Sequence, residues 1–197
     1  LLNVLGCLDI PTSGEYYLDG MSVRNMGKNE RASFRNLKIG FIFQSYNLLP
    51  KTTALENVEL PLLYNPSYSK RARRERALDA LKAVGLENRI HHRSNQMSGG
   101  QQQRVAIARA MVNDPVILLA DEATGNLDTR TSYEILALFQ RLHAEGRTII
   151  FVTHTPKIAE FISRNILLRD GQIIEDKVNL QIGSAQQALE ALPKEND

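Results

Sequence analysis

The sequence predicts an α/β domain with a largely parallel sheet, because β-rich and helix-rich stretches alternate along its 197 residues. Three apolar runs of strand length carry this prediction: residues 37–43, 116–120 and 148–152, the last of which is rich in β-branched residues. We expect all three strands to be buried on both faces. The composition, 43% hydrophobic and 23% charged, is that of an ordinary globular chain.

Composition excludes several classes of protein. The net charge is +2, which is too small to make nucleic acid the expected partner. The only cysteine, Cys7, excludes an internal disulfide and a four-cysteine zinc site, and we expect it to pack as a small hydrophobe. No stretch approaches 18 apolar residues, so we expect no membrane span within these residues.

The remaining elements follow from turn residues and helical periodicity. A short strand is expected within residues 14–20, between two glycines. Residues 53–95 have helical character, and Pro61 and Pro66 should divide them into more than one helix. Asp170-Gly171 should close a hairpin, because this dipeptide adopts positive φ readily. The polar tail from residue 184 should hold one weak helix.

Two carboxylates, Asp121 and Glu122, directly follow the apolar run at 116–120. In open α/β sheets, ligands bind beyond the carboxyl ends of the strands. Asp121 suits Mg²⁺, either directly or through water, and Glu122 is placed to polarise an attacking water. Taken alone, the pattern also fits a buried strand that ends in charged loop residues.

A second segment, Ser98-Gly99-Gly100-Gln101, has the spacing of a capping box, so a helix is expected to begin at Gly99. The first backbone N–H groups of a helix are unpaired and lie at the positive end of its dipole. Two glycines leave these N–H groups accessible, which favours a binding site for phosphate oxygens. The alternative is a plain glycine-rich helix cap.

Together, these two segments resemble the signature helix and the Walker B strand of ABC-type ATPases. Gln44, which follows a strand, resembles the Q-loop of that family, residues 125–128 resemble its D-loop, and His154 resembles its switch histidine. The resemblance extends from Leu1 to about residue 178. Residues 43–50 and 54–58, together with Pro61-Leu62, resemble the macrolide-export and lipoprotein-release branch of these cassettes.

The resemblance implies a P-loop NTPase-like core in one ATPase domain, residues 1–197, that binds ATP and Mg²⁺. The helical subdomain would span residues 53–113, the second part of the core 114–180 and the tail 181–197. The residues with implied roles are Asp121 and Gln44 at the metal, Glu122 and His154 in catalysis, Ser98, Gly99, Gly100 and Gln101 at the phosphates of the opposite chain, and Asp128 across the dimer interface.

The resemblance also implies partners. These are a second ATPase subunit and a transmembrane permease, at the cytoplasmic face of the inner membrane, that together export or extract macrolide, peptide or lipoprotein cargo. No nucleic acid is expected. Two other interpretations stay open: a catalytically dead regulatory subunit that donates its signature motif to a complete partner, and a non-transport ABC ATPase.

One motif of the family is absent from the 197 residues. The P-loop sequence G-x-x-G-x-G-K followed by Ser or Thr does not occur, and residues 1–9 resemble the segment that directly follows it in relatives. We therefore expect the chain to be truncated before or at the P-loop. Loss of about three charge-assisted hydrogen bonds would weaken ATP binding roughly 10³- to 10⁶-fold, so residues 1–197 alone should hydrolyse no ATP above background.

Overall fold

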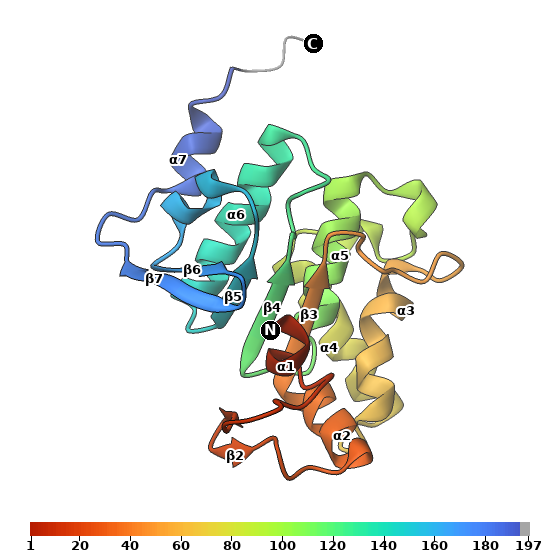
Figure 1. Cartoon of the computed structure of the whole chain (residues 1–197). Coiled ribbons are helices and arrows are strands. Elements are labelled where there is room, and N and C mark those ends of the chain that lie inside the picture. The colour runs from red at the N-terminus through yellow and green to blue at the C-terminus, as the bar shows by residue number, and fades with distance from the viewer. Residues whose placement is uncertain (194–197) are drawn as a thin grey trace. The chain divides into compact units, whose positions relative to one another are not determined.

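The structure is a computed structural model that describes residues 1–193. The chain divides into two compact units (Figure 1). The first comprises residues 1–126 and 147–152, and the second comprises residues 127–146 and those from 153 onward. The boundaries at 53–113, 114–180 and 181–197 that the sequence predicts stay a prediction.

A parallel sheet forms the centre of the first unit, which confirms the predicted α/β class. Its strand order is β3 (Ile39–Phe43), β4 (Ile117–Asp121) and β5 (Thr148–Val152). Strand β3 begins two residues later than the apolar run predicts, because Leu37 and Lys38 complete helix α2 (Lys28–Lys38).

The three strands of the sheet differ in burial. The first four residues of β4, the central strand, are all buried, as predicted. The same prediction is wrong for β5, where Thr148 and Val152 are exposed and the three residues between them are half-buried. The outer strand β3 also has one strand neighbour, but helices α2 and α5 (Gly99–Met111) pack against it, whereas the main packing partner of β5 among the described residues is β4.

Helices α2 and α5 of the first unit pack against β3, and α3 (Ala54–Glu59) and α4 (Lys70–Ala83) pack against α5. The predicted division of the helical segment is confirmed, because Pro61 lies in the first turn of a 3₁₀ helix that interrupts it. The expected short strand at 14–20 is one arm of a hairpin that turns at Asp19 and Gly20, both with positive φ. The other elements are α1 (Leu2–Leu5), β1 (Tyr17–Leu18), β2 (Met21–Ser22), η1 (Leu60–Tyr64), η2 (Glu87–Arg89) and η3 (Ser94–Gln96).

Helix α5 lies directly against β3 (Figure 1). A Cβ atom at Gly40 would overlap the carbonyl oxygen of Ala110 and would lie 2.6 Å from Cδ2 of Leu118. The absence of a side chain at Gly40 therefore sets how closely the helix approaches the strand.

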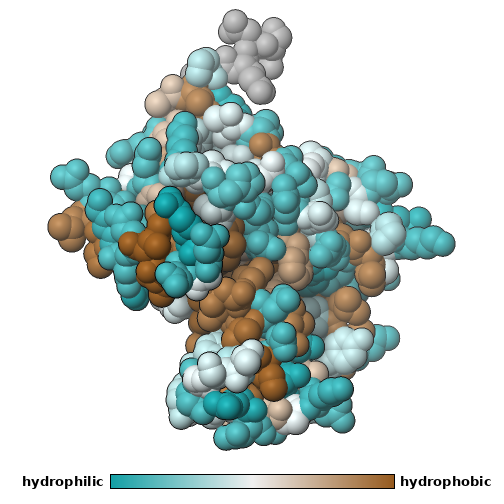
Figure 2. Space-filling model, viewed as in Figure 1, coloured by the Kyte–Doolittle hydropathy of each residue, from teal (hydrophilic) through white to brown (hydrophobic). Residues whose placement is uncertain are grey.

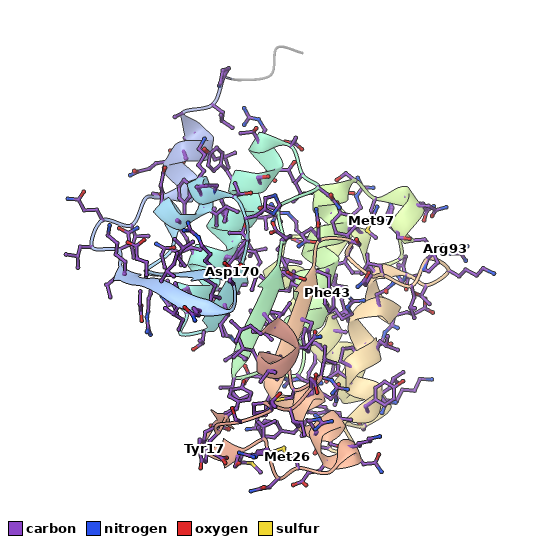
Figure 3. All side chains as sticks on the ribbon, viewed as in Figure 1. Tyr17, Met26, Phe43, Arg93, Met97 and Asp170 are labelled. Carbon is purple, nitrogen blue, oxygen red and sulfur yellow. The ribbon has the colours of Figure 1, made fainter. Side chains whose placement is uncertain are left out.

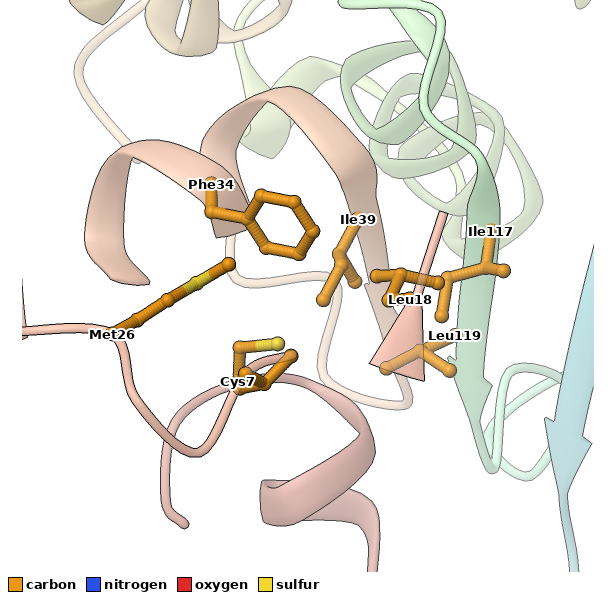
Figure 4. Close-up of a cluster of buried hydrophobic side chains, with 8 residues drawn as sticks. Cys7, Leu18, Met26, Phe34, Ile39, Ile117 and Leu119 are labelled. Carbon is orange, nitrogen blue, oxygen red and sulfur yellow. The ribbon is translucent and has the colours of Figure 1, made fainter. Parts of the chain in front are cut away.

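A cluster of buried side chains joins the N-terminal elements to the sheet (Figure 4). Cys7 is fully buried there, which confirms its packing as a small hydrophobe, and burial raises the pKa of its thiol. The cluster comprises Cys7, Leu18, Val23, Met26, Phe34, Ile39, Ile117 and Leu119.

The second unit consists of α6 (Thr129–Ala144), η4 (Pro156–Phe161), the hairpin β6 (Arg164–Arg169) and β7 (Gln172–Val178), and α7 (Ala185–Glu190). Its hairpin turns at Asp170 (φ 50°) and Gly171 (φ 78°), as the sequence predicts. Helix α7 is the helix expected in the tail, and residues 194–197 of that tail lie outside the described residues.

Both units expose apolar surface (Figure 2). In the first unit it gathers over α1, where Leu1 is 74% exposed, and in the second over the β6–β7 hairpin, where Ile173 is 63% exposed. None of the helices among residues 1–193 has both the length and the apolar content needed to cross a bilayer.

Candidate functional site

The register of the parallel sheet brings three predicted site residues to one edge. Phe43, labelled in Figure 3, pairs with Asp121, and Asp121 pairs with Val152. Gln44 and Glu122 each directly follow this aligned row. We call the three residues Gln44, Asp121 and Glu122 the sheet edge, and all three are half-buried.

Glu122 has an unusual backbone conformation. Its φ is +48°, in the left-handed region that non-glycine residues rarely adopt. The turn is fixed on both sides, because Glu122 N donates to Val152 O (2.9 Å) and Gly125 N donates to Glu122 O (2.9 Å). Strained residues of this kind persist where surrounding structure holds them, and they cluster at functional sites.

Two hydrogen bonds hold Gln44 against the loop that follows β4. Gln44 Nε2 donates to Asn126 Oδ1 (3.0 Å), and Asn126 Nδ2 donates to the carbonyl oxygen of Gln44 (3.2 Å). Sequence reasoning placed Gln44 and the segment 125–128 in two separate motifs. The structure shows that two of these residues are in contact.

Arg109 is a site residue that sequence reasoning missed. From the last turn of α5, its guanidinium donates to the carbonyl oxygens of Tyr46 (2.8 Å) and Asn47 (2.6 Å), in the loop that follows Gln44. Both residues have positive φ, and burial lowers the pKa of Arg109. Arg109 therefore joins α5, the helix that begins at the predicted phosphate-binding turn, to the loop after Gln44. From the sequence alone, Arg109 is expected to be an exposed charged residue of the helix.

The predicted phosphate-binding turn, residues 98–101, has the expected local structure. Helix α5 begins at Gly99 with Ser98 as its N-cap. Ser98 Oγ accepts from Gln101 N (3.3 Å), and Gln101 Oε1 accepts from Ser98 N (3.1 Å), which completes the capping box. The helix itself offers no acceptor to the N–H groups of Gly99 and Gly100.

In the described residues, the side chains of Ser98 and Gln101 make hydrogen bonds only within this turn, residues 98–101. The structure therefore does not join the turn to the sheet edge by a direct bond of Ser98.

Two predicted residues lie in the second unit. Asp128 is exposed and forms the N-cap of α6, with Oδ1 accepting from Thr131 N (2.9 Å) and Oδ2 from Thr131 Oγ1 (2.6 Å). These bonds from the Thr131 hydroxyl and backbone lower the pKa of the Asp128 carboxyl. His154 is exposed in a turn in which Thr155 N donates to Thr153 Oγ1 (3.0 Å).

Replacing Asp128 by alanine is expected to lower the free energy of unfolding by about 1 kcal/mol, because the N-cap of α6 is lost. Asp128→Asn should cost less than Asp128→Ala, since asparagine also caps helices well. Folding lowers the pKa of the Asp128 carboxyl, so aspartate should add to the free energy of unfolding relative to asparagine above the ordinary aspartate pKa. This added stability is lost as pH falls through the carboxyl pKa of the folded protein. Urea unfolding of the three proteins at pH 7 and pH 3 measures both effects, and equal midpoints for Asp128→Ala and Asp128→Asn would contradict the capping role.

A separate hollow of about 660 Å³ lies on the first unit among α2, β3, η1 and α5. Its walls are largely apolar and include Phe41, Pro61 and Tyr64, with Arg109 at one side. None of the sequence-predicted site residues lines it. Among residues 1–193, no group of three or more His, Cys, Asp or Glu side chains is arranged to hold a metal ion.

Comparison with known proteins identifies the family. The family model described as "ABC transporter" matches residues 1–125. The chain belongs to the ABC transporter family. It is 56% identical over 173 residues to an ABC transporter ATP-binding protein of Thermotoga maritima, covering 88% of this chain and 74% of the relative.

Two further ABC proteins extend the comparison. The macrolide export ATP-binding/permease protein MacB of Bartonella henselae is 50% identical, over 91% of this chain and 27% of that protein. A dimeric structure of the ATP-binding cassette MJ0796 bound to ADP and Pi has a TM-score of 0.78 and 46% identity, covering 90% of this chain and 78% of that one. These comparisons confirm the ABC ATPase fold and the family activity, ATP hydrolysis coupled to transport.

Proposed function

We propose that the sheet edge and the turn at residues 98–101 are parts of an ATP site that is shared between two cassettes. Asp121 would hold Mg²⁺, Gln44 would present its amide oxygen to the metal or the attacking water, and Glu122 would accept a proton from that water. His154 would contact the γ-phosphate, and Asp128 would lie at the dimer interface. The single observation that carries the proposal is the register that aligns Phe43 with Asp121, because it sets Gln44 and Glu122 at one edge.

The donors at the sheet edge fit Mg²⁺. This ion takes few protein oxygens and completes its shell with water and phosphate oxygens, so one carboxylate and one amide oxygen are sufficient. Gln44 Oε1 accepts no hydrogen bond from the described residues, because its amide nitrogen is the atom that faces Asn126. When bound, Mg²⁺ would neutralise charge on the phosphates.

The proposed partners are a second copy of the cassette and a transmembrane permease, which would place the chain at the cytoplasmic face of the inner membrane. Support for the second copy comes from the dimeric MJ0796 structures. Support for the permease comes from relatives that are named ATP-binding/permease proteins for macrolide export. The proposed cargo is amphipathic and of the macrolide, peptide or lipoprotein class.

A complementation experiment tests the shared site. Ser98→Asp keeps a good N-cap for α5 but sets a negative charge where the phosphate would bind, so ATP hydrolysis should be lost while the melting temperature is kept. Glu122→Gln should also be inactive. Both variants are made in the protein as its gene encodes it.

An equimolar mixture of the two inactive variants should recover about a quarter of the wild-type rate. Half of the dimers would then be mixed, and each mixed dimer would hold one complete site. A mixture that stays inactive, although exchange of subunits is demonstrated, would show that Ser98 and Glu122 do not serve opposite chains.

A further inference from the structure

Gln44 and Asn126 are 82 residues apart in sequence and hold each other through a reciprocal pair of hydrogen bonds in the first unit. One bond runs from Gln44 Nε2 to Asn126 Oδ1 (3.0 Å), and the other from Asn126 Nδ2 to Gln44 O (3.2 Å). The pair links the loop after β3 to the loop after β4, at the edge where the nucleotide is expected.

The chemistry of the pair leaves only one orientation for each amide. The carbonyl oxygen of Gln44 can only accept, so Asn126 must present its Nδ2 to that atom. The Oδ1 of Asn126 then faces the side chain of Gln44, and because Oδ1 can only accept, Gln44 must present Nε2. The Oε1 of Gln44 is consequently directed away from Asn126, and it accepts no hydrogen bond from the described residues.

Gly125 provides the space for this arrangement. A Cβ atom at position 125 would lie 2.7 Å from Gln44 Nε2 and 3.2 Å from its Cδ. Any side chain there would displace the Gln44 amide, and this flexible side chain could move without disturbing the strands. Asn126 thus fixes the orientation of the Gln44 amide, and Gly125 leaves the space that the amide occupies.

We propose that Asn126 is the positioning residue that directs the amide oxygen of Gln44 toward the metal or the attacking water during ATP hydrolysis. This inference rests on the function proposed above for Gln44. Asn126 acts through Gln44 and need not touch the nucleotide. Without the hydrogen bonds to Asn126, the Gln44 amide can rotate. Its nitrogen, which is a donor, then competes with its oxygen for the position that faces the cation.

The first test measures the environment of the Gln44 side-chain amide by NMR and needs no ATP hydrolysis. In nitrogen-labelled 197-residue chain, the side-chain amide resonances of Gln44 are identified by their loss in Gln44→Ala. Asn126→Ala should shift them toward the values of free glutamine, whereas Asn126→Asp, which keeps the acceptor for Nε2 but loses the donor to Gln44 O, should shift them less. Asn95→Ala, at an exposed asparagine, is the matched control and should leave them unchanged. Gln44 resonances that do not respond to Asn126→Ala would overturn the inference.

The second test measures ATP hydrolysis against Mg²⁺ concentration in the protein as its gene encodes it. Asn126→Ala should raise the Mg²⁺ concentration for half-maximal rate about tenfold, since among the described residues only the hydrogen bond from Gln44 Nε2 to Asn126 Oδ1 holds the side-chain amide and its loss has about this effect. Gly125→Ala should do the same, and Gly27→Ala, at a glycine with nothing within 4 Å of the new Cβ, should not. A general structural defect would lower the maximal rate or the melting temperature and leave the Mg²⁺ dependence unchanged.

A double-variant comparison separates this inference from the proposed function. In a Gln44→Ala background, Asn126→Ala should have no further effect on the Mg²⁺ dependence, because the residue it positions is absent. If Asn126→Ala still acts there, the positioning role is wrong while the role of Gln44 stands. If Gln44→Ala itself leaves the Mg²⁺ dependence unchanged, the proposed role of Gln44 fails, and the positioning inference fails with it.

Discussion

Glutamine in place of Glu122 is expected to lower the rate of ATP hydrolysis by about 10²- to 10⁴-fold, the usual contribution of a positioned general base. The substitution preserves the shape of the side chain and removes only its ability to take a proton. Because the φ of Glu122 is +48° and its backbone is bonded to Val152 and Gly125, the turn itself should be unchanged. Affinity for ATP should therefore be kept. Single-turnover hydrolysis and nucleotide-binding assays, both with Mg²⁺, measure the two quantities.

The matched control for this variant is Glu145→Gln. Glu145 is exposed at the end of α6 and lies 3.9 Å from Arg141, so its loss of charge should affect neither rate nor affinity. A Glu122→Gln protein that retains more than a tenth of the wild-type rate would show that another group accepts the proton. Equal loss of rate and of ATP affinity would instead indicate a role in binding.

Alanine in place of Gly40 is expected to lower the free energy of unfolding by about 3 kcal/mol, at the upper end of the range for an overpacked core. The new Cβ would overlap the carbonyl oxygen of Ala110 and lie 2.9 Å from its carbonyl carbon. Neither atom belongs to a flexible side chain, so β3 and α5 must move apart. Urea unfolding of the 197-residue chain, followed by circular dichroism, measures the change.

Gly27→Ala is the control, because nothing lies within 4 Å of a Cβ at that position and its φ is −65°. Its cost should stay below about 1 kcal/mol, the size of a helix-cap effect. A smaller loss of stability in Gly40→Ala than in Gly27→Ala would mean that α5 can shift away from β3 freely. In that case, the position of the turn at residues 98–101 would not be fixed by this contact.

The sequence was informative wherever a local pattern has a local cause. The capping box of Ser98 and Gln101 is formed by atoms within four residues, and the hairpin at Asp170-Gly171 follows from the φ angles that these residues adopt. The end of β4 at Asp121 follows from the change from apolar to charged residues. These features need no knowledge of the rest of the chain.

Prediction failed where the outcome depends on neighbours distant in sequence. The composition of β5 is that of a buried strand, but the burial of a strand depends on which elements pack against it, as α2 and α5 do against β3. The sequence around Arg109 predicts an exposed charged residue on a helix. Only the fold shows that its guanidinium reaches the carbonyl groups of Tyr46 and Asn47, which are 63 and 62 residues away.

The sequence alone determined the identity and order of the chemical groups: Gln44, the turn at 98–101, the two carboxylates, Asp128 and His154. The tertiary structure alone decided which of these groups meet. The register of β3 with β4 sets Gln44 beside the carboxylates, and the close contact at Gly40 fixes α5 on the same sheet. Hydrogen bonds with Asn126 then orient the Gln44 amide. The physical reason is that motif chemistry is encoded by adjacent residues, whereas strand register and packing distance depend on contacts between segments that fold together from far apart.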